Sequence, residues 1–306
     1  MIVLVKDKKE ANCITHSGTM HADEVFATAF LDLLLKDIKV CRTLDINQDD
    51  YKDNVFIYDI GRGQFDHHQL DAEKRENGIT YCSFGLLWKQ FGRLYLEQEN
   101  ISNIEDVFLG VDKDLVEAID ADDNGVFPKI DAEYKVKTLS SIIKLFNPSF
   151  GSLDDENIQF LKAVTIAREI LLEEIKTIED KVKAKYKLLD IIYNNKTNIL
   201  ILNEYMPYEE TLLQEDKEQK IDFVVFPSNR GGFNVKTIPK SQEDKTYRKE
   251  FPLEWAGLVD QEFENVSGVV GARFCHSTRF LLSCDTMDAA MNLIDKALSS
   301  EINNVL

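Results

Sequence analysis

The sequence lacks any apolar run of the roughly 18 residues that a membrane-spanning helix needs. Its first residues, MIVLVKDKKEANC, also lack the order of basic, apolar and small residues that a secretory signal peptide has. Cysteine is scarce, with five in 306 residues, and no two form a CxxC pair. These absences exclude a membrane protein and a disulfide scaffold, so we expect a cytoplasmic protein with reduced, mostly buried thiols.

Basic residues are too few to balance the acidic ones: 36 Lys and Arg stand against 54 Asp and Glu, for a net charge of −18. A protein that grips long nucleic acid through its phosphates normally carries a basic surface, so we expect no long duplex as a partner. Two hypotheses remain. Either the protein binds no nucleic acid, or it takes short RNA or a small anionic nucleotide at a locally positive site, which bound divalent metal can provide.

A length of 306 residues predicts two domains. The first part of the chain alternates between an apolar run at 12–16, a helical pattern at 22–37, and strand-like segments at 38–44 and 54–61. This order predicts an α/β domain with a mostly parallel sheet. Further helices are expected over 80–100, 104–121 and about 155–193.

The pattern changes after residue 193, where short strands take over from the long helical stretch. Strands are expected over 197–203, 221–228 and 232–239, with a hairpin turn at 229–232. A final helix is expected over 286–300, with Thr286 as its N-cap. The sequence therefore predicts a larger domain at 1–193 that includes the long helix, and a smaller α+β domain at 194–306.

Four of the five histidines lie between positions 16 and 68: His16, His21, His67 and His68. They follow predicted parallel strands, and Asp59 ends one of these strands. In open α/β sheets, ligands bind at this edge. Histidine nitrogen combined with carboxylate oxygen is the ligand set of Mn²⁺, Fe²⁺, Co²⁺ or Zn²⁺, and the absence of thiolates argues against a closed structural zinc site.

Carboxylates accompany these histidines. Asp23 follows His21 by two residues, and Asp66 directly precedes His67. The predicted helix end AIDADDNG adds Asp120, Asp122 and Asp123. Taken singly, a His-His pair or an acidic helix end is ordinary solvated surface. Taken together, two histidine clusters and separated carboxylates suit two metals that share a bridging carboxylate and activate a water for phosphoryl transfer.

The segments THSGTMHADEVFATAFL, YDIGRGQFDHHQ and IDADDNGV resemble motifs of the melanocyte-proliferating-gene exonuclease family, metal-dependent hydrolases similar to the DHH phosphoesterase superfamily. YCSFGLLWKQFG and FPLEWAGLVDQEFENVSGVVGARFCHS resemble two further blocks, so the resemblance runs nearly end to end. It implies a DHH-like catalytic domain at 1–193 and a substrate-binding domain at 194–306. It also implies two divalent metal ions, with Mn²⁺ favoured, and exonuclease-like hydrolysis of RNA or short oligonucleotides by metal-activated water.

The resemblance also implies roles for single residues. The implied metal ligands are His16, His21, Asp23, Asp59, His67 and Asp120. Asp59 is implied to bridge both ions, and Asp123 stays open as an alternative to Asp120 because the motif offers two carboxylates. The implied catalytic group is Asp59, Asp66 and His68, in which Asp66 orients a histidine and His68 contacts the substrate phosphate.

The chain departs from the family pattern after its C-terminal histidine. The family continues with a glycine-containing run, whereas this chain has CHSTRFLLSCD at 275–285, which removes the backbone approach to phosphate that glycines allow. The remaining candidates for binding an anionic substrate are Arg230, Arg273, His276 and Arg279. The alternative for His276 is packing beside Phe274 and Phe280 in a small core.

Two other functions fit the same residues. One is a metal-dependent hydrolase of pyrophosphate or a cyclic dinucleotide, because a fold does not settle the substrate. The other is a degenerate nucleotide-binding module, which the changed C-terminal motif favours and the complete set of candidate ligands opposes. The sequence also leaves a homodimer open.

Overall fold

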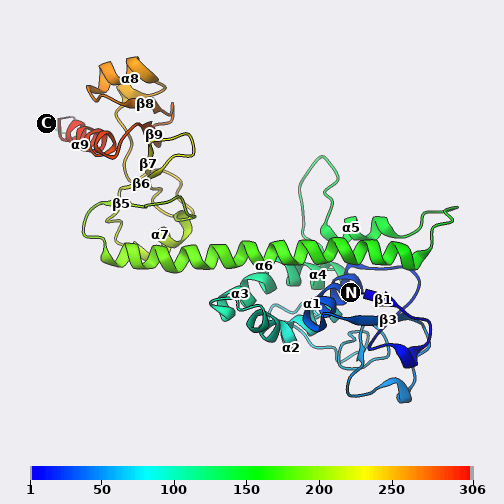
Figure 1. Ribbon diagram of the computed structural model, residues 1–306. Coiled ribbons are helices and arrows are strands. Elements are labelled where there is room, and N and C mark those ends of the chain that lie inside the picture. Colours follow the sequence, from blue (N-terminus) through cyan, green and yellow to red (C-terminus); the bar gives the residue numbers. More distant parts are fainter. Residues whose placement is uncertain (1, 304–306) are drawn as a thin grey trace. The chain divides into compact units, whose positions relative to one another are not determined.

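The computed structural model describes residues 2–303 (Figure 1). The chain divides into two compact units, Met1–Val182 and Lys183–Leu306. The division falls within the long helix α6 (Glu156–Asn194), whereas the boundary expected from the sequence, 193/194, lies at the end of this helix. Within residues 2–303, none of the helices combines the length and the apolar composition of a membrane-spanning segment.

The first unit contains a four-stranded sheet in the order β1-β3-β2-β4, and every neighbouring pair is parallel, which confirms the predicted parallel sheet. Its strands are β1 (Ile2–Leu4), β2 (Cys13–Thr15), β3 (Ile38–Arg42) and β4 (Phe56–Ile57). Helix α1 (Ala22–Leu35) connects β2 to β3 as a parallel crossover requires. The carboxyl ends of β2 and β4 therefore lie side by side at one edge.

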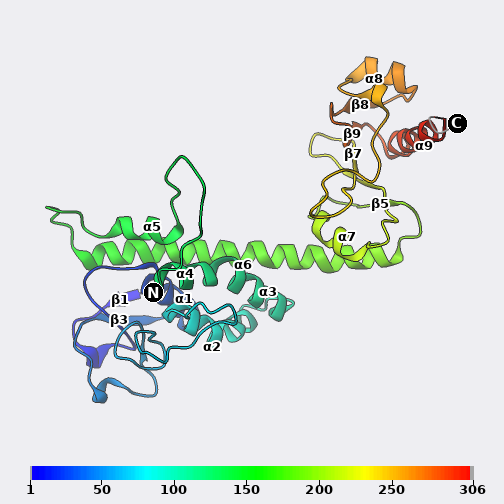
Figure 2. The same cartoon turned by 180° about the vertical axis from the view of Figure 1, so that it is seen from behind.

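Helices α2 (Ser83–Gln98), α4 (Glu117–Asp123) and α5 (Leu139–Ile143) contact α1 (Figures 1 and 2). Helix α3 (Ile104–Val111) and the π-helical turn η3 (Asp112–Val116) contact α2. Aromatic side chains fill the contact: Phe30 of α1 lies 5.4 Å from Trp88 and 6.3 Å from Phe84, measured between ring centroids. The continuous helix predicted over 104–121 is interrupted by the π-helical turn, a feature frequent near functional sites.

The second unit contains a mixed sheet in the order β5-β6-β7-β9-β8. Its strands are β5 (Ile199–Ile201), β6 (Phe223–Pro227), β7 (Phe233–Thr237), β8 (Ala272–Cys275) and β9 (Leu281–Cys284). Only the β5–β6 pair is parallel. The helices are α7 (Glu209–Glu215), α8 (Asp260–Ser267) and α9 (Met287–Asn303). The fold is thus α/β, with a parallel sheet in one unit and a mixed sheet in the other.

Local sequence signals explain several boundaries in the second unit. The amide of Ser228 donates to the carbonyl of Gly232 at 2.9 Å, which closes the predicted hairpin turn between β6 and β7. The Thr286 hydroxyl accepts from the amide of Ala289 at 3.1 Å, which confirms Thr286 as the N-cap of α9. All five cysteines are buried and free, as expected for reduced thiols. Short 3₁₀ turns lie at Lys8–Glu10, Gln48–Asp50, Lys144–Phe146 and Leu253–Trp255.

Candidate metal centre

The parallel sheet of the first unit places the candidate ligands at its carboxyl edge. His16 directly follows β2, and Asp59 follows β4 after one intervening residue. Helix α1 then begins at Ala22 and carries Asp23 and Glu24 in its first turn. These short connections bring residues from separate stretches of sequence to one place, as the strand order predicts.

Asp59 sits in an unusual backbone conformation. Its φ is 55°, in the left-handed region that aspartate tolerates better than most residues. The amide of Asp59 donates to the carbonyl of Phe65 at 3.0 Å, which ties the loop that follows β4 back onto itself. A residue held in such a conformation by its surroundings is often part of a functional site.

The first cluster consists of His16, His21, Glu24 and Asp59, which each offer one ligand atom within 4.8 Å of the others. His16 Nε2 lies 3.1 Å from Asp59 Oδ2 and 3.3 Å from Glu24 Oε1. Its other nitrogen, Nδ1, lies 3.1 Å from the carbonyl of Ser17, which fixes the ring. Burial lowers the pKa of His16, but hydrogen bonds to Asp59 and Glu24 outweigh it and raise the pKa to about 11. The cluster therefore favours a positive charge at this point.

Glu24 was not among the ligands expected from the sequence. Its side chain is fully buried, and it accepts from the amide of His21 at 2.9 Å in a capping box that opens α1. Glu24 stands three residues after His21 at a helix start, and this spacing indicates helix capping. The sequence therefore gives no separate sign that Glu24 also contacts His16. Only the fold shows that the same carboxylate also reaches His16.

The second cluster consists of Asp23, His67 and Asp123. His67 Nε2 lies 2.9 Å from Asp123 Oδ2, while its Nδ1 lies 3.6 Å from Asp23 Oδ2 and 3.8 Å from Asp59 Oδ1. The second oxygen of Asp23, Oδ1, accepts from the amide of Phe84 at 3.0 Å. Asp59 belongs to the first cluster, and its other oxygen faces His67 of the second cluster. A bridging ligand needs this position.

Three buried atoms in and beside the second cluster have no hydrogen-bond partner among residues 2–303: Asp23 Oδ2, His67 Nδ1 and Oδ1 of the neighbouring Asp59. A buried polar atom without a partner costs about 1–3 kcal/mol, and more when it is charged. Burial, together with the negative charges of Asp59 and Asp123, raises the pKa of Asp23. A divalent cation would satisfy all three atoms and relieve the repulsion, so the residues present fit a metal.

Asp66 and His68 form a hydrogen-bonded pair beside these clusters. His68 Nδ1 lies 2.6 Å from Asp66 Oδ1, and Asp66 Oδ2 accepts from the amide of Arg62 at 2.6 Å. Burial raises the pKa of Asp66, but hydrogen bonds from His68 and from the Arg62 amide outweigh it and lower the pKa. The His68 side chain is 59% exposed, so its Nε2 is the nitrogen left to meet a substrate.

Asp120, expected among the ligands, lies in neither cluster. Its Oδ2 accepts from Arg75 Nε at 2.7 Å and its Oδ1 accepts from the amide of Cys82 at 2.9 Å. Arg75 also forms a bidentate pair with Asp112 at 2.6 and 2.8 Å. Because the charge of Asp120 is already compensated, the carboxylate that contacts His67 is Asp123, the alternative offered by the same motif.

The expected substrate-binding residues of the second unit are engaged locally. Arg273 pairs with Asp285 and donates to the carbonyl of Gly231 at 2.9 Å. Arg279 pairs with Glu250. Both guanidinium groups therefore already have carboxylate partners.

His276 takes the packed arrangement. Its ring centroid lies 4.7 Å from that of Phe280 and 6.1 Å from that of Phe274. Its Nδ1 lies 2.8 Å from the Thr278 hydroxyl within the turn between β8 and β9. His276 thus organises this turn, which is the alternative that its sequence neighbours suggested.

Comparison with known proteins places the chain in a family. The MYG1_exonuc family model, described as uncharacterised protein family UPF0160, matches residues 12–298. An MYG1 protein of Saccharomyces cerevisiae is 27% identical over 97% of this chain and 98% of its own length. The MYG1 exonuclease of Homo sapiens is 26% identical over 93% of this chain and 85% of its own.

A solved structure also matches the chain, that of RecJ in complex with Mg²⁺ from Thermus thermophilus. It is 12% identical with a TM-score of 0.28, and the match covers 95% of this chain but 51% of the RecJ chain. The family match rests on the sequence, because the model and the relatives cover nearly the whole chain. As its motifs predicted, the chain belongs to the MYG1 exonuclease family.

Proposed function

We propose that this protein is a divalent-metal-dependent phosphodiesterase that hydrolyses RNA or short oligonucleotides from one end. The observation that carries the proposal is the set of three buried, unpartnered atoms, Asp23 Oδ2, Asp59 Oδ1 and His67 Nδ1. A divalent cation would satisfy two carboxylate oxygens and an imidazole nitrogen at once. The names of relatives, such as the MYG1 exonucleases of Homo sapiens and Rattus norvegicus, support nucleic acid as the substrate class.

Two ions would occupy the two clusters. The first would be held by His16, His21, Glu24 and Asp59, and the second by Asp23, Asp59 and His67, with Asp123 holding the His67 ring through Nε2. Mixed imidazole and carboxylate ligands suit Mn²⁺, Fe²⁺, Co²⁺ or Zn²⁺, and among these the family resemblance implies Mn²⁺. When bound, such a pair supplies Lewis acidity and a nucleophilic water at neutral pH.

The residues of the chain have separate tasks in this site. Asp59 holds the two clusters in register because one oxygen faces His16 and the other faces His67. Asp66 holds the His68 ring through Nδ1, so that Nε2 can contact a phosphate oxygen or give a proton to the leaving oxygen. Asp123 fixes His67 in the tautomer whose Nδ1 lacks a proton.

The substrate is short and single-stranded in this proposal. With a net charge of −18, the chain repels a long polyanion, and bound metal would supply concentrated positive charge at the site. We propose that the second unit selects the substrate, as the family resemblance implied for 194–306.

The experiment uses the full chain, stripped of metal with a chelator and then supplied with Mn²⁺, and a short RNA labelled at one end. We expect hydrolysis only after Mn²⁺ is restored, with single nucleotides released progressively from one end. Asp59→Asn should abolish hydrolysis while its far-ultraviolet circular dichroism matches that of the wild type. Hydrolysis that persists without metal, or that survives in Asp59→Asn at near wild-type rates, would refute the proposal.

A further inference from the structure

Strand β8 of the second unit contains a β-bulge. Ala272 pairs with Cys284 and Phe274 pairs with Ser283, so Arg273 is an extra residue in the strand. In a regular strand, Arg273 and Phe274 would point to opposite faces. The bulge turns both side chains away from the core. The residues that flank them in the strand, Ala272 and Cys275, are the buried ones. A guanidinium and an aromatic ring thus stand next to each other on one side of the sheet.

The same side of the sheet carries a row of side chains in register. Phe226 pairs with Asn234, Asn234 pairs with Ser283, and Ser283 pairs with Phe274. These four residues line one groove of about 680 Å³, a size typical of sites for small ligands. Tyr205 lines the groove as well, with a side chain that is 62% exposed and a ring 5.5 Å from that of Phe226.

The opposite side of the sheet is closed by α9. Leu293 and Ile294 of this helix are buried in one cluster with Val235 and Leu282, which alternate along their strands with the residues that line the groove. The sheet therefore has one face committed to the core and one face that presents aromatic, amide and hydroxyl groups.

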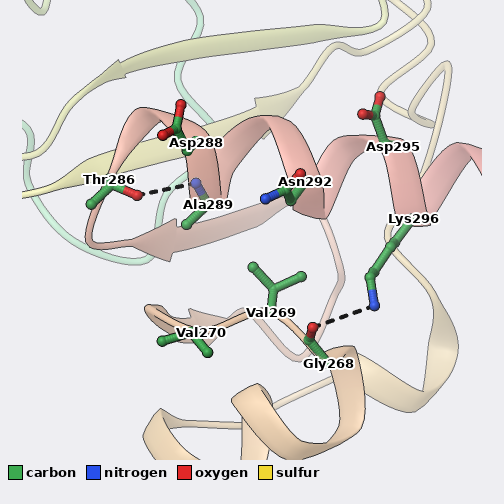
Figure 3. Close-up of a pocket in the computed structure, with 9 residues that line it drawn as sticks. All are labelled: Gly268, Val269, Val270, Thr286, Asp288, Ala289, Asn292, Asp295 and Lys296. Atoms are coloured by element: carbon green, nitrogen blue, oxygen red, sulfur yellow. Dashed lines mark hydrogen bonds between the residues drawn. The ribbon is translucent and has the colours of Figure 1, made fainter.

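One uncompensated cation lines the groove and can meet an anion. Arg230 and Arg273 line it, against one carboxylate, Asp260. Asp285 compensates the charge of Arg273. The exposed Arg230 forms no ion pair with another residue between 2 and 303, so its charge is uncompensated. A second cavity of about 630 Å³ lies between α9 and the loop at 268–270 (Figure 3). This cavity is acidic, because it is lined by Asp288 and Asp295 against one lysine, Lys296. The Lys296 ammonium already donates to the carbonyl of Ser267.

We propose that the groove over β6, β7, β8 and β9, together with Tyr205, binds the bases of a single-stranded oligonucleotide. Phe274 and Tyr205 supply the planes on which bases stack, as aromatic side chains do on the open sheets that bind single-stranded RNA. Arg230, which has no carboxylate partner among residues 2–303, contacts phosphate, and Asn234 with Ser283 can bond to base edges. This inference rests on the proposed function for its substrate class, and it places base recognition on β8 and its neighbours.

The test measures binding without hydrolysis. The full chain carrying Asp59→Asn is titrated into two fluorescent tetramers, one an RNA and the other an abasic chain of equal length and charge. We expect Tyr205→Ala and Phe274→Leu to weaken RNA binding roughly five- to a hundredfold, the range of one lost stacking contact, and to leave the abasic tetramer unchanged. Arg230→Ala should weaken both tetramers. Val270→Ala, at an 86% exposed position of the cavity in Figure 3, is the matched control and should change neither.

The outcomes separate this inference from the proposed function. If both aromatic variants bind RNA as the parent does, or lose affinity for both tetramers equally, the groove does not read bases and the inference is wrong. If the parent binds neither tetramer, it is wrong as well. Hydrolysis by the wild type is scored in a separate assay. Suppose that the wild type hydrolyses no RNA, while the groove still binds RNA more tightly than the abasic tetramer. The proposed hydrolase activity would then be refuted, and base recognition by the groove would stand.

Discussion

Asp123 lies 2.9 Å from Nε2 of His67, and this contact decides which ring nitrogen faces the other carboxylates. When the neutral ring donates Nε2–H to Asp123, the lone pair lies on Nδ1, 3.6 Å from Asp23 Oδ2. An imidazole held in this way is ready to bind a metal, because its lone pair already faces the acidic side chains. Asp123 therefore positions the histidine whether or not it also touches the ion.

Replacing Asp123 by alanine should weaken binding of the second ion by roughly 10- to 100-fold, the usual cost of losing a group that orients a ligand. Calorimetric titration with Mn²⁺ measures this directly. Asp122→Ala is the matched control, since it removes the adjacent carboxylate and Asp122 belongs to no cluster of candidate ligands among residues 2–303. Equal affinities in the two variants would exclude the role given to Asp123.

Asp120 should behave as a structural residue. It is buried with both oxygens bonded, to Arg75 and to the amide of Cys82. Asp120→Ala leaves the guanidinium of Arg75 with Asp112 alone, and breaking a buried pair typically costs about 3–5 kcal/mol. Unfolding in urea should show this loss, while the folded fraction keeps its full metal content. If Asp120→Ala lost metal at unchanged stability, Asp120 would be a metal ligand.

Glu24→Gln separates the two roles of that side chain. The amide oxygen of glutamine can still accept from the amide of His21, so the start of α1 should be preserved. The negative charge beside His16 is lost, and the first ion should bind roughly 10- to 100-fold more weakly. Elemental analysis after dialysis should find less metal per chain than in the wild type. Glu97→Gln, on the exposed side of α2, serves as the control.

His68→Ala should impair turnover and spare metal binding. The side chain is exposed and contacts Asp66, so its loss removes a proton donor or phosphate contact worth roughly 10²–10⁴ in rate. Asp66→Asn should lower the rate in the same direction, because it releases the His68 ring. Single-turnover hydrolysis of a short RNA, with metal content measured in parallel, distinguishes this role from that of a ligand. Metal loss in His68→Ala would show that the histidine binds an ion.

Much of the first unit could be predicted from its sequence. The alternation of short apolar runs with a helical period is a local signal, and it indicates a parallel sheet with His16 and Asp59 at its carboxyl edge. Strands β8 and β9 could not be predicted in the same way. The bulge at Arg273 puts two consecutive side chains on one face, which destroys the alternation that identifies a strand.

The choice between Asp120 and Asp123 also lay beyond the sequence. Both residues lie at the same helix end. They differ in that Asp120 contacts Arg75, which lies 45 positions away along the chain, so local sequence does not show the contact. Glu24 was hidden for a related reason. Its spacing from His21 is explained completely by helix capping, so no unexplained feature pointed to its contact with His16.

Anomalous diffraction from crystals soaked in Mn²⁺ tests the metal centre most directly. We expect two peaks joined by Asp59, one bonded to His16 and the other to His67 Nδ1 and Asp23, with ligand distances of about 2.0–2.3 Å. The same data from Asp59→Asn should lose at least one peak. A soaked crystal in which His67 Nδ1 and Asp23 Oδ2 remain without an ion, or in which manganese binds elsewhere, would contradict a two-metal hydrolase.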